Sequence, residues 1–231
     1  MIRLNVVGNA VMDVYRIIPE IRFPLHVPSI IGLYNNCRYQ SYKRFAEINH
    51  CSYYDVINLL ESKSGNTQFD KRNGRYLIIC NESENPFRWR WTCAHELGHV
   101  LCGHFLDYSN ESDLENSTIL SGNNDYEKEA DLFAASLLSP IPLFDILEIR
   151  KPDDLVEMFG ISIHASQIRW TEYKRLRNEK KDLSSFHEIR SLFNKKRPLD
   201  EILFDVPHHA VSFPEPLNPI YYHTSNSYFD H

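Results

Sequence analysis

One stretch of the chain, residues 85–103, limits the fold more than any other, because its side chains separate into two chemically different helical faces. It opens with an Asn-Pro pair, typical of a helix start, and a glycine marks its expected end. At about 100° per residue, His95 and His99 lie about 40° apart on one face. Four apolar side chains lie on the opposite face, between about 140° and 260° from the first histidine: Ala94, Leu97, Val100 and Leu101. The stretch therefore predicts a helix with one face in the core and a separate histidine face.

The histidine face contains the spacing His-Glu-x-x-His, which suits a metal ion. Residues four apart lie one turn apart on the same face, so the imidazoles of His95 and His99 can reach one ion. Glu96 falls about 100° from His95, beside this face. In a chain with 11 histidines, the pattern arises by chance with a probability of roughly 4%. The interpretation therefore needs a third ligand.

A second helix, predicted at residues 125–140, offers acidic side chains for that purpose. Catalytic zinc usually has three protein ligands and one water. The buried stripe of this helix is expected to contain these residues: Ala130, Phe133, Ala134, Leu137 and Leu138. Measured from Ala130, Glu127 lies at about 60°, on the edge of this stripe, whereas Glu129 lies at about 260° and is expected in solvent. Asp131, at about 100°, is placed to support a ligand from behind. We favour Glu127 as the third ligand and keep Glu129 as the alternative.

Residues just after the histidines are weaker candidates for the third ligand. A metzincin-type histidine, six residues after His99, would stand at the position of Phe105. His104 comes one residue too early and follows the glycine. Cys102 shares the histidine face but lies a turn further along, and a small buried hydrophobic residue is its simpler interpretation.

The composition argues against several classes of protein. The 231 residues are 42% hydrophobic, enough for one sizeable core, and the net charge of −6 argues against direct nucleic-acid binding. No stretch approaches the roughly 20 apolar residues of a membrane span, and the first residues do not resemble a signal peptide. The five cysteines are odd in number and contain no Cys-x-x-Cys pair, so free thiols in a reducing compartment are expected. We expect a cytoplasmic protein that does not contact membranes.

The remaining pattern predicts an α+β protein with a small antiparallel sheet packed on several helices. A Ser-capped helix is expected at 52–63, and an Asn-Gly pair within 66–81 predicts a hairpin with Tyr76–Cys80 as its second strand. Residues 37–46 alternate aromatic and polar side chains, as a half-buried strand does. Further helices are expected in these ranges: 1–36, 141–150, 152–160 and 162–181. Two polar or proline-rich ranges are expected to be irregular: 105–124 and 205–231.

Residues 168–197 form a basic segment, with ten Lys or Arg against four Asp or Glu, a net of +6. A solvated pair of helices is the simpler interpretation. A docking surface for an acidic partner or nucleic acid is the alternative.

Two motifs together resemble the ImmA/IrrE-type metallopeptidases: RWTCAHELGHVLCGH at 90–104 and YEKEADLFAASLLSP at 126–140. The resemblance implies a zincin-like domain. It divides the chain into three parts: an N-terminal helical segment (1–34), the metallopeptidase domain (35–178), and a C-terminal basic helix with an extended tail (179–231). It also implies one zinc ion on His95, His99 and Glu127, with Glu96 as the catalytic base.

The implied activity is that of a zinc-dependent endopeptidase that cleaves a helix-turn-helix repressor of a mobile element or stress regulon. Strand Tyr76–Cys80 would then be an edge that pairs with extended substrate. His104, Tyr126 and His164 are candidates for stabilising the oxyanion. Two other classes stay open: a non-catalytic zinc-binding regulatory protein, and a small-molecule metallohydrolase that uses the same helix.

Overall fold

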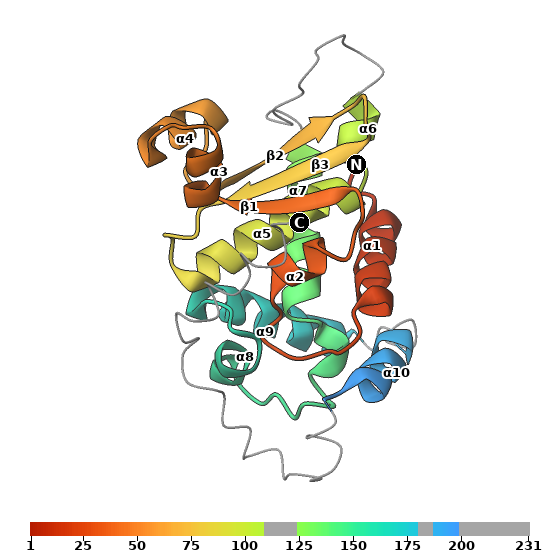
Figure 1. The fold of residues 1–231 in the computed structure, drawn as a ribbon. Coiled ribbons are helices and arrows are strands. Elements are labelled where there is room, and N and C mark those ends of the chain that lie inside the picture. Colours follow the sequence, from red (N-terminus) through yellow and green to blue (C-terminus); the bar gives the residue numbers. More distant parts are fainter. Residues whose placement is uncertain (109–123, 180–186, 199–231) are drawn as a thin grey trace.

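A three-stranded sheet forms one wall of the fold, and helices pack behind it (Figure 1). The computed structural model describes residues 1–108, 124–179 and 187–198. The strands are β1 (Cys37–Ser41), β2 (Gly65–Asp70) and β3 (Arg75–Cys80). The helices are α1 (Leu4–Ile17), α2 (Val27–Ile31), α3 (Tyr42–Ile48), α4 (Tyr53–Leu60), α5 (Pro86–Leu101), α6 (His104–Tyr108), α7 (Asn124–Leu138), α8 (Pro152–Phe159), α9 (Ile163–Asn178) and α10 (His187–Lys196). The predicted α+β class is confirmed.

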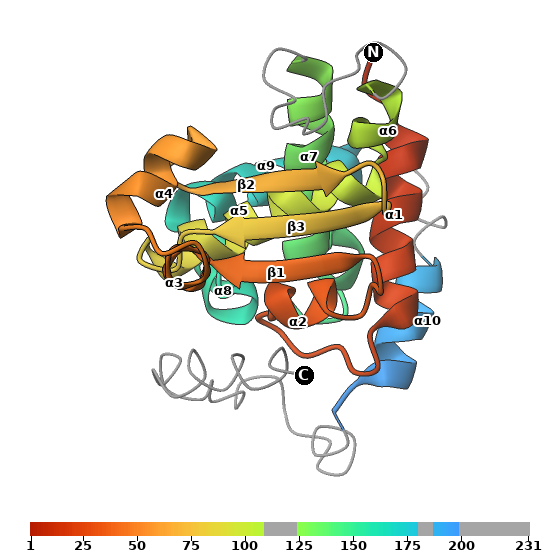
Figure 2. The same cartoon turned by 45° about the horizontal axis from the view of Figure 1, so that its top comes forward.

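The sheet is mixed, whereas the sequence analysis predicted an antiparallel one. β1 pairs in parallel with β3, and β2 pairs antiparallel with β3, in the order β1-β3-β2. Helices α3 and α4 follow β1 at one end of the sheet, so β2 starts from that end and the hairpin returns β3 between the two strands (Figure 2). The prediction that Tyr76–Cys80 is an edge strand is therefore wrong, because β3 is central and β2 is the edge.

Local sequence explains where the strands end. The turn between β2 and β3 contains Gly74 at φ +63°, and Asp70 accepts hydrogen bonds from two backbone N–H groups of the turn. The strand predicted at 37–46 ends instead at Ser41. The hydroxyl of Ser41 accepts a hydrogen bond from the backbone N–H three residues later and caps α3. The hairpin is confirmed, and the first strand is shorter than predicted.

Helices α5 and α7 are in close contact because the glycine of the histidine motif faces α7. A Cβ atom at Gly98 would lie 3.0 Å from the Phe133 ring and 3.2 Å from the Cα of Ala130. A larger residue would push the two helices apart. Asn85 caps α5 as predicted, since its side chain accepts a hydrogen bond from a first-turn N–H. The close contact brings the acidic start of α7 beside the histidines of α5.

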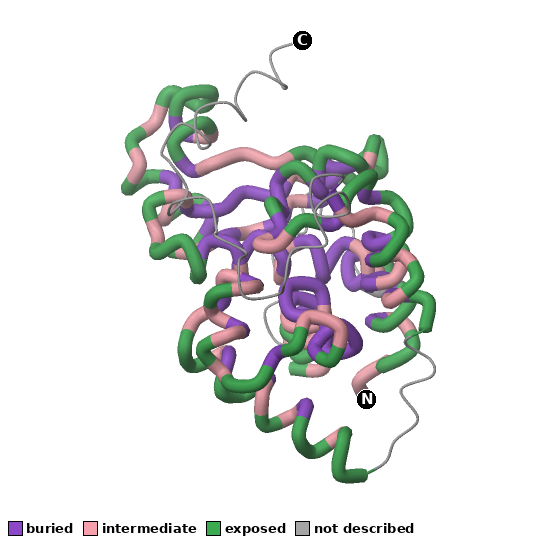
Figure 3. Tube along the Cα trace, turned by 90° about the horizontal axis from the view of Figure 1, so that it is seen from below, coloured by how far each residue is buried: buried purple, intermediate pink, exposed green. Residues whose placement is uncertain are grey.

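The N-terminal helix α1 packs on α7 and shares its core. The hydroxyl of Tyr15 donates a hydrogen bond of 2.7 Å to the carbonyl of Leu137, and both groups are buried. On the outer side, Arg16 forms an ion pair of 2.7 Å with Glu188 of α10. Figure 3 shows the buried residues gathered in the middle of the molecule and the outer turns of the helices exposed. Residues 1–36 contain two helices, as predicted.

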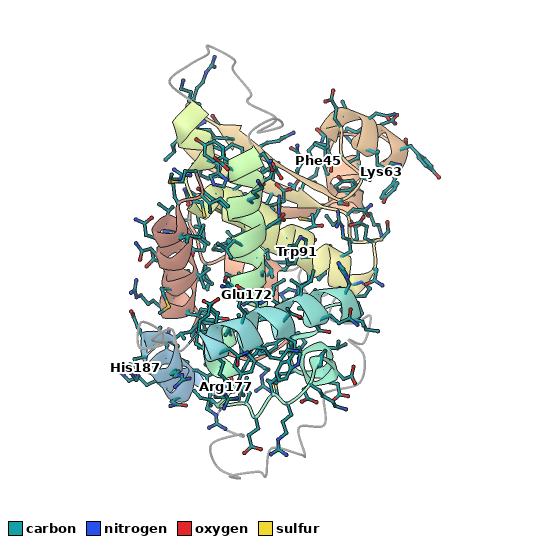
Figure 4. The ribbon with its side chains drawn as sticks, turned by 180° about the vertical axis from the view of Figure 1, so that it is seen from behind. Phe45, Lys63, Trp91, Glu172, Arg177 and His187 are labelled. Carbon is teal, nitrogen blue, oxygen red and sulfur yellow. The ribbon has the colours of Figure 1, made fainter. Side chains whose placement is uncertain are left out.

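Helix α9 crosses the lower end of α7 in the view from behind, with Glu172 facing that crossing (Figure 4). Arg169 is buried there: its guanidinium donates hydrogen bonds to the Ser139 carbonyl at 2.7 Å and to Glu172 at 2.6 Å. Arg169 of the basic segment therefore stabilises the interior and is not part of a charged surface.

Two other predictions need correction. The helix predicted at 141–150 is only a 3-10 turn, η1 (Ile141–Leu143), followed by turns that reach Glu148 at φ +50°, a backbone conformation that an α-helix cannot contain. In the loop predicted at 105–124, residues 105–108 are helical in α6 and Asn124 begins α7. Residues 109–123 lie outside the described residues, as does the tail at 205–231. The division of the chain at 34 and 178 stays a prediction. Among the described helices, none is long and apolar enough to cross a membrane.

Candidate active site

Three predicted metal ligands come together where α5 meets the start of α7. The Nε2 atoms of His95 and His99 lie 3.0 Å apart. The Glu127 carboxylate lies 3.3 Å from the first of these atoms and 3.6 Å from the second. One ligand atom from each residue lies within 4.8 Å of the others, and no other such group occurs among the residues that the structure describes.

The hydrogen bonds behind His95 fix the tautomer that a metal requires. Its Nδ1 atom lies 3.0 Å from the Oδ1 atom of Asp131. A carboxylate only accepts hydrogen bonds, so Nδ1 carries the hydrogen and the lone pair of Nε2 faces the site. This is the support that the helical position of Asp131 predicted.

His99 is held in the same tautomer by a longer chain of contacts. The Nε2 atom of His104 lies 2.9 Å from the Glu129 carboxylate and must donate to it. The Nδ1 atom of His104 is then an acceptor, and it lies 2.9 Å from Nδ1 of His99. His99 therefore donates from Nδ1 and turns its Nε2 lone pair toward the site. Two imidazole nitrogens and one carboxylate fit a catalytic zinc ion with one position left for water.

The prediction that Glu129 faces solvent is wrong. Its exposed fraction is 0%. Besides His104, the carboxylate accepts hydrogen bonds from Arg3: 2.6 Å from the backbone N–H, 3.1 Å from Nε and 2.8 Å from Nη2. A helical-wheel analysis cannot detect this, because Arg3 lies 126 residues away in the sequence. No feature of the sequence points to Arg3, and His104 drew attention only as a possible ligand or oxyanion donor.

The electrostatics of the three proposed ligands differ. Burial lowers the pKa of His95, but the hydrogen bonds that it donates to Asp131 and Glu127 outweigh burial and raise this pKa to about 9. Burial and the neighbouring His95 lower the pKa of His99 to about 3, so His99 is neutral at pH 7. The hydrogen bond to His95 lowers the pKa of Glu127, which keeps its carboxylate ionised. All three groups can thus bind a cation once His95 releases its proton.

Glu96 lies beside the histidines and is held by the edge strand. The hydroxyl of Thr67, on β2, donates a hydrogen bond of 2.7 Å to its Oε2 atom. Burial raises the pKa of Glu96, against the opposing effects of His95 and Thr67. A raised pKa brings a carboxylate closer to the range in which a general base works near neutral pH.

A cavity of about 300 Å³ opens over these groups. Its floor contains Glu96 and the three ligands, and its walls include Leu60 at the end of α4, Asn66 at the start of β2 and Phe105 of α6. Since β2 pairs only with β3, its other edge is free of strand partners within the described chain.

The three candidates for the oxyanion donor do not line this cavity. His104 is fully buried and bonded to His99 and Glu129, and the ring of Tyr126 stacks on it with centroids 4.5 Å apart. His164 lies exposed on α9. The oxyanion role therefore has no candidate among them.

Comparison with protein families gives one match. The model of the IrrE N-terminal-like domain, a peptidase family (Peptidase_M78), matches residues 56–171, which include α5, α7 and all the groups on the cavity floor. No curated protein matches the chain. The match covers half of the chain, so the protein belongs to the IrrE N-terminal-like peptidase family, and its chemistry is of the metallopeptidase type.

Proposed function

We propose that the protein is a zinc-dependent endopeptidase that cleaves a helix-turn-helix repressor. The observation that carries the proposal is the convergence of His95, His99 and Glu127, with Glu96 beside them on the floor of one cavity. Two imidazoles and one carboxylate form the ligand set of several zinc peptidases. Manganese or iron can bind to the same ligands, because two imidazoles and one carboxylate do not select strongly among these ions.

Different residues of the site would have different roles in the reaction. His95, His99 and Glu127 would hold the ion, which supplies Lewis acidity toward the scissile carbonyl and lowers the pKa of a water molecule. Glu96 would accept a proton from the attacking water and deliver it to the leaving amine. Thr67 orients Glu96 from the edge strand, because its hydroxyl donates to Oε2 and directs the carboxylate.

The free edge of β2 supports a peptide as the substrate. An extended peptide can add to a sheet edge through backbone hydrogen bonds, and this edge borders the cavity at Asn66 and Thr67. A small-molecule hydrolase would have no use for such an edge. The repressor as the particular substrate is supported only by the resemblance to the ImmA/IrrE-type peptidases.

Incubation of purified, zinc-loaded protein with candidate repressors tests the proposal. We expect the wild type to cut one of them, and Glu96→Gln to retain zinc while cleavage falls by about 10²- to 10⁴-fold, the usual contribution of a general base. Glu157→Gln, the same change at an exposed position of α8, is the matched control and should cleave normally.

Two results would contradict the proposal. Undiminished cleavage by Glu96→Gln with full zinc would remove Glu96 as the base. A wild type that binds zinc and repressors but cuts none of them would favour the non-catalytic regulatory protein instead.

A further inference from the structure

We propose that Arg3 is a positioning residue for the metal ligand His99, acting through Glu129 and His104. The inference rests on the proposed metal-dependent function. It also goes beyond that function, because Arg3 lies outside the matched residues 56–171 and belongs to this chain's own N-terminal segment.

A continuous series of hydrogen bonds joins Arg3 to the metal site. The guanidinium and backbone N–H of Arg3 bind the carboxylate of Glu129 at 2.6–3.1 Å. That carboxylate accepts from His104 at 2.9 Å, and His104 accepts from His99 at 2.9 Å. With a neutral His104, the donors and acceptors of the series have one consistent assignment, which ends with the His99 Nε2 lone pair directed at the site.

Burial makes the guanidinium necessary to this arrangement. Glu129 and His104 each have an exposed fraction of 0%, and a buried carboxylate is costly unless it is paired and hydrogen-bonded. Arg3 meets both needs because its planar fork reaches both carboxylate oxygens through Nε and Nη2. If the guanidinium is removed, two of the contacts described above remain for the Glu129 carboxylate: His104 and the backbone N–H of residue 3.

The ring of Tyr126 contacts two members of the series, Arg3 and His104. It stacks on His104, and the Arg3 guanidinium lies 5.2 Å from the ring centroid. Groups behind a metal-bound histidine orient its ring and raise its basicity, so their loss usually weakens metal binding. The N-terminal segment should therefore tune the metal affinity of a site formed by α5 and α7.

A purely structural role for Arg3 makes a different prediction. If Arg3 only fastens the N-terminal segment to α7, its removal lowers the melting temperature of the metal-free protein but leaves the zinc affinity unchanged. Zinc affinity therefore separates the two roles, and activity is not needed as a readout.

The test measures zinc affinity of the full chain by competition with a chromogenic chelator, with melting curves of the metal-free protein. We expect Arg3→Ala to weaken zinc binding by about 10- to 100-fold, as losses behind a ligand do. Arg16→Ala is the matched control: it removes another N-terminal arginine that joins α1 to α10 through an exposed pair with Glu188. We expect that variant to bind zinc as the wild type does.

A second variant keeps the test decisive if Arg3→Ala fails to fold. Arg3→Lys retains the charge beside Glu129 but loses the fork, so we expect an intermediate affinity and a shifted cobalt absorption spectrum. Wild-type zinc affinity and cobalt spectrum in the Arg3 variants would overturn the inference while leaving the proposed function intact. A wild type that binds no zinc would overturn both.

Discussion

The two histidines of α5 direct their Nε2 atoms at the same point, yet they are supported from behind in different ways. His95 is backed by one carboxylate, Asp131, whose side chain is 56% exposed. His99 is backed by His104 and Glu129, both fully buried. Water and salt weaken an exposed contact, whereas a satisfied buried network is strong and rigid. We infer that the ring of His99 is held more firmly in its position than the ring of His95.

The difference in support also separates the charge states of the two rings. In the metal-free protein, hydrogen bonds to two carboxylates overcome burial and raise the pKa of His95 to about 9. His99 is backed by an imidazole instead of a carboxylate, and burial and the neighbouring His95 lower its pKa to about 3. The site therefore holds one imidazolium and one imidazole at pH 7, which lets the rings share a close contact of 3.0 Å.

The largest effect should come from removing one of the three metal ligands. We expect about one zinc ion per chain in the wild type and none in His95→Ala, His99→Ala or Glu127→Ala, measured by atomic emission on dialysed protein. His164→Ala, which removes an exposed histidine of α9, should keep its zinc. Full zinc occupancy in a His95 and His99 double variant would show that the ion binds elsewhere.

Breaking the buried support should have the next largest effect. Glu129→Ala leaves the fork of Arg3 and Nε2 of His104 without their carboxylate, so the free energy of unfolding should fall by about 2 kcal/mol and zinc binding should weaken as well. Chemical denaturation of the metal-free protein measures the first quantity. An exposed Glu129 would tolerate the change, so a variant with unaltered stability and affinity would contradict the burial of this residue.

Breaking the exposed support should have a smaller effect. Asp131→Ala is expected to weaken zinc binding by about 10-fold with little change in stability, because its contact is open to solvent. The same chelator competition measures it. If Asp131→Ala weakens binding more than Glu129→Ala, the assignment of His99 as the better supported ligand is wrong.

The smallest effect concerns the proton that His95 releases when zinc binds. His95 carries a proton below pH 9 in the metal-free protein and must lose it to bind zinc, so zinc affinity should rise with pH and level off above about 9. At pH 7 binding should release about one proton from the site, a number that calorimetry in buffers of different ionisation enthalpy measures. Asp131→Asn should release less, because the pKa of His95 falls when a carboxylate is lost. Equal release by both proteins would place the proton elsewhere.

The sequence predicted those features that depend on residues within one or two turns of each other. Helices α5 and α7, the cap of α5 and the hairpin turn are of this kind, as is the position of Glu127 at the edge of the buried stripe of α7. The features that were missed depend on distant partners. β3 became central because β1, from much earlier in the chain, pairs with its other edge. Glu129 can be buried because Arg3, 126 residues earlier in the chain, binds its carboxylate, and a count of apolar positions around a helix cannot show that.

The spacing of three acidic residues on α7 has a consequence for how the site is completed during synthesis. Glu127, Glu129 and Asp131 occupy alternate positions of the helix. Glu127 lies beside the Nε2 atoms of the two histidines, Glu129 binds His104 behind His99, and Asp131 binds His95 from behind. Arg3 and α5 leave the ribosome well before them, on the order of 10 s earlier for Arg3 at ordinary rates of translation. One helical turn then delivers the third ligand and both supports together. A nascent chain that ends before α7 should therefore be unable to retain the metal, so that metal capture waits for the synthesis of α7.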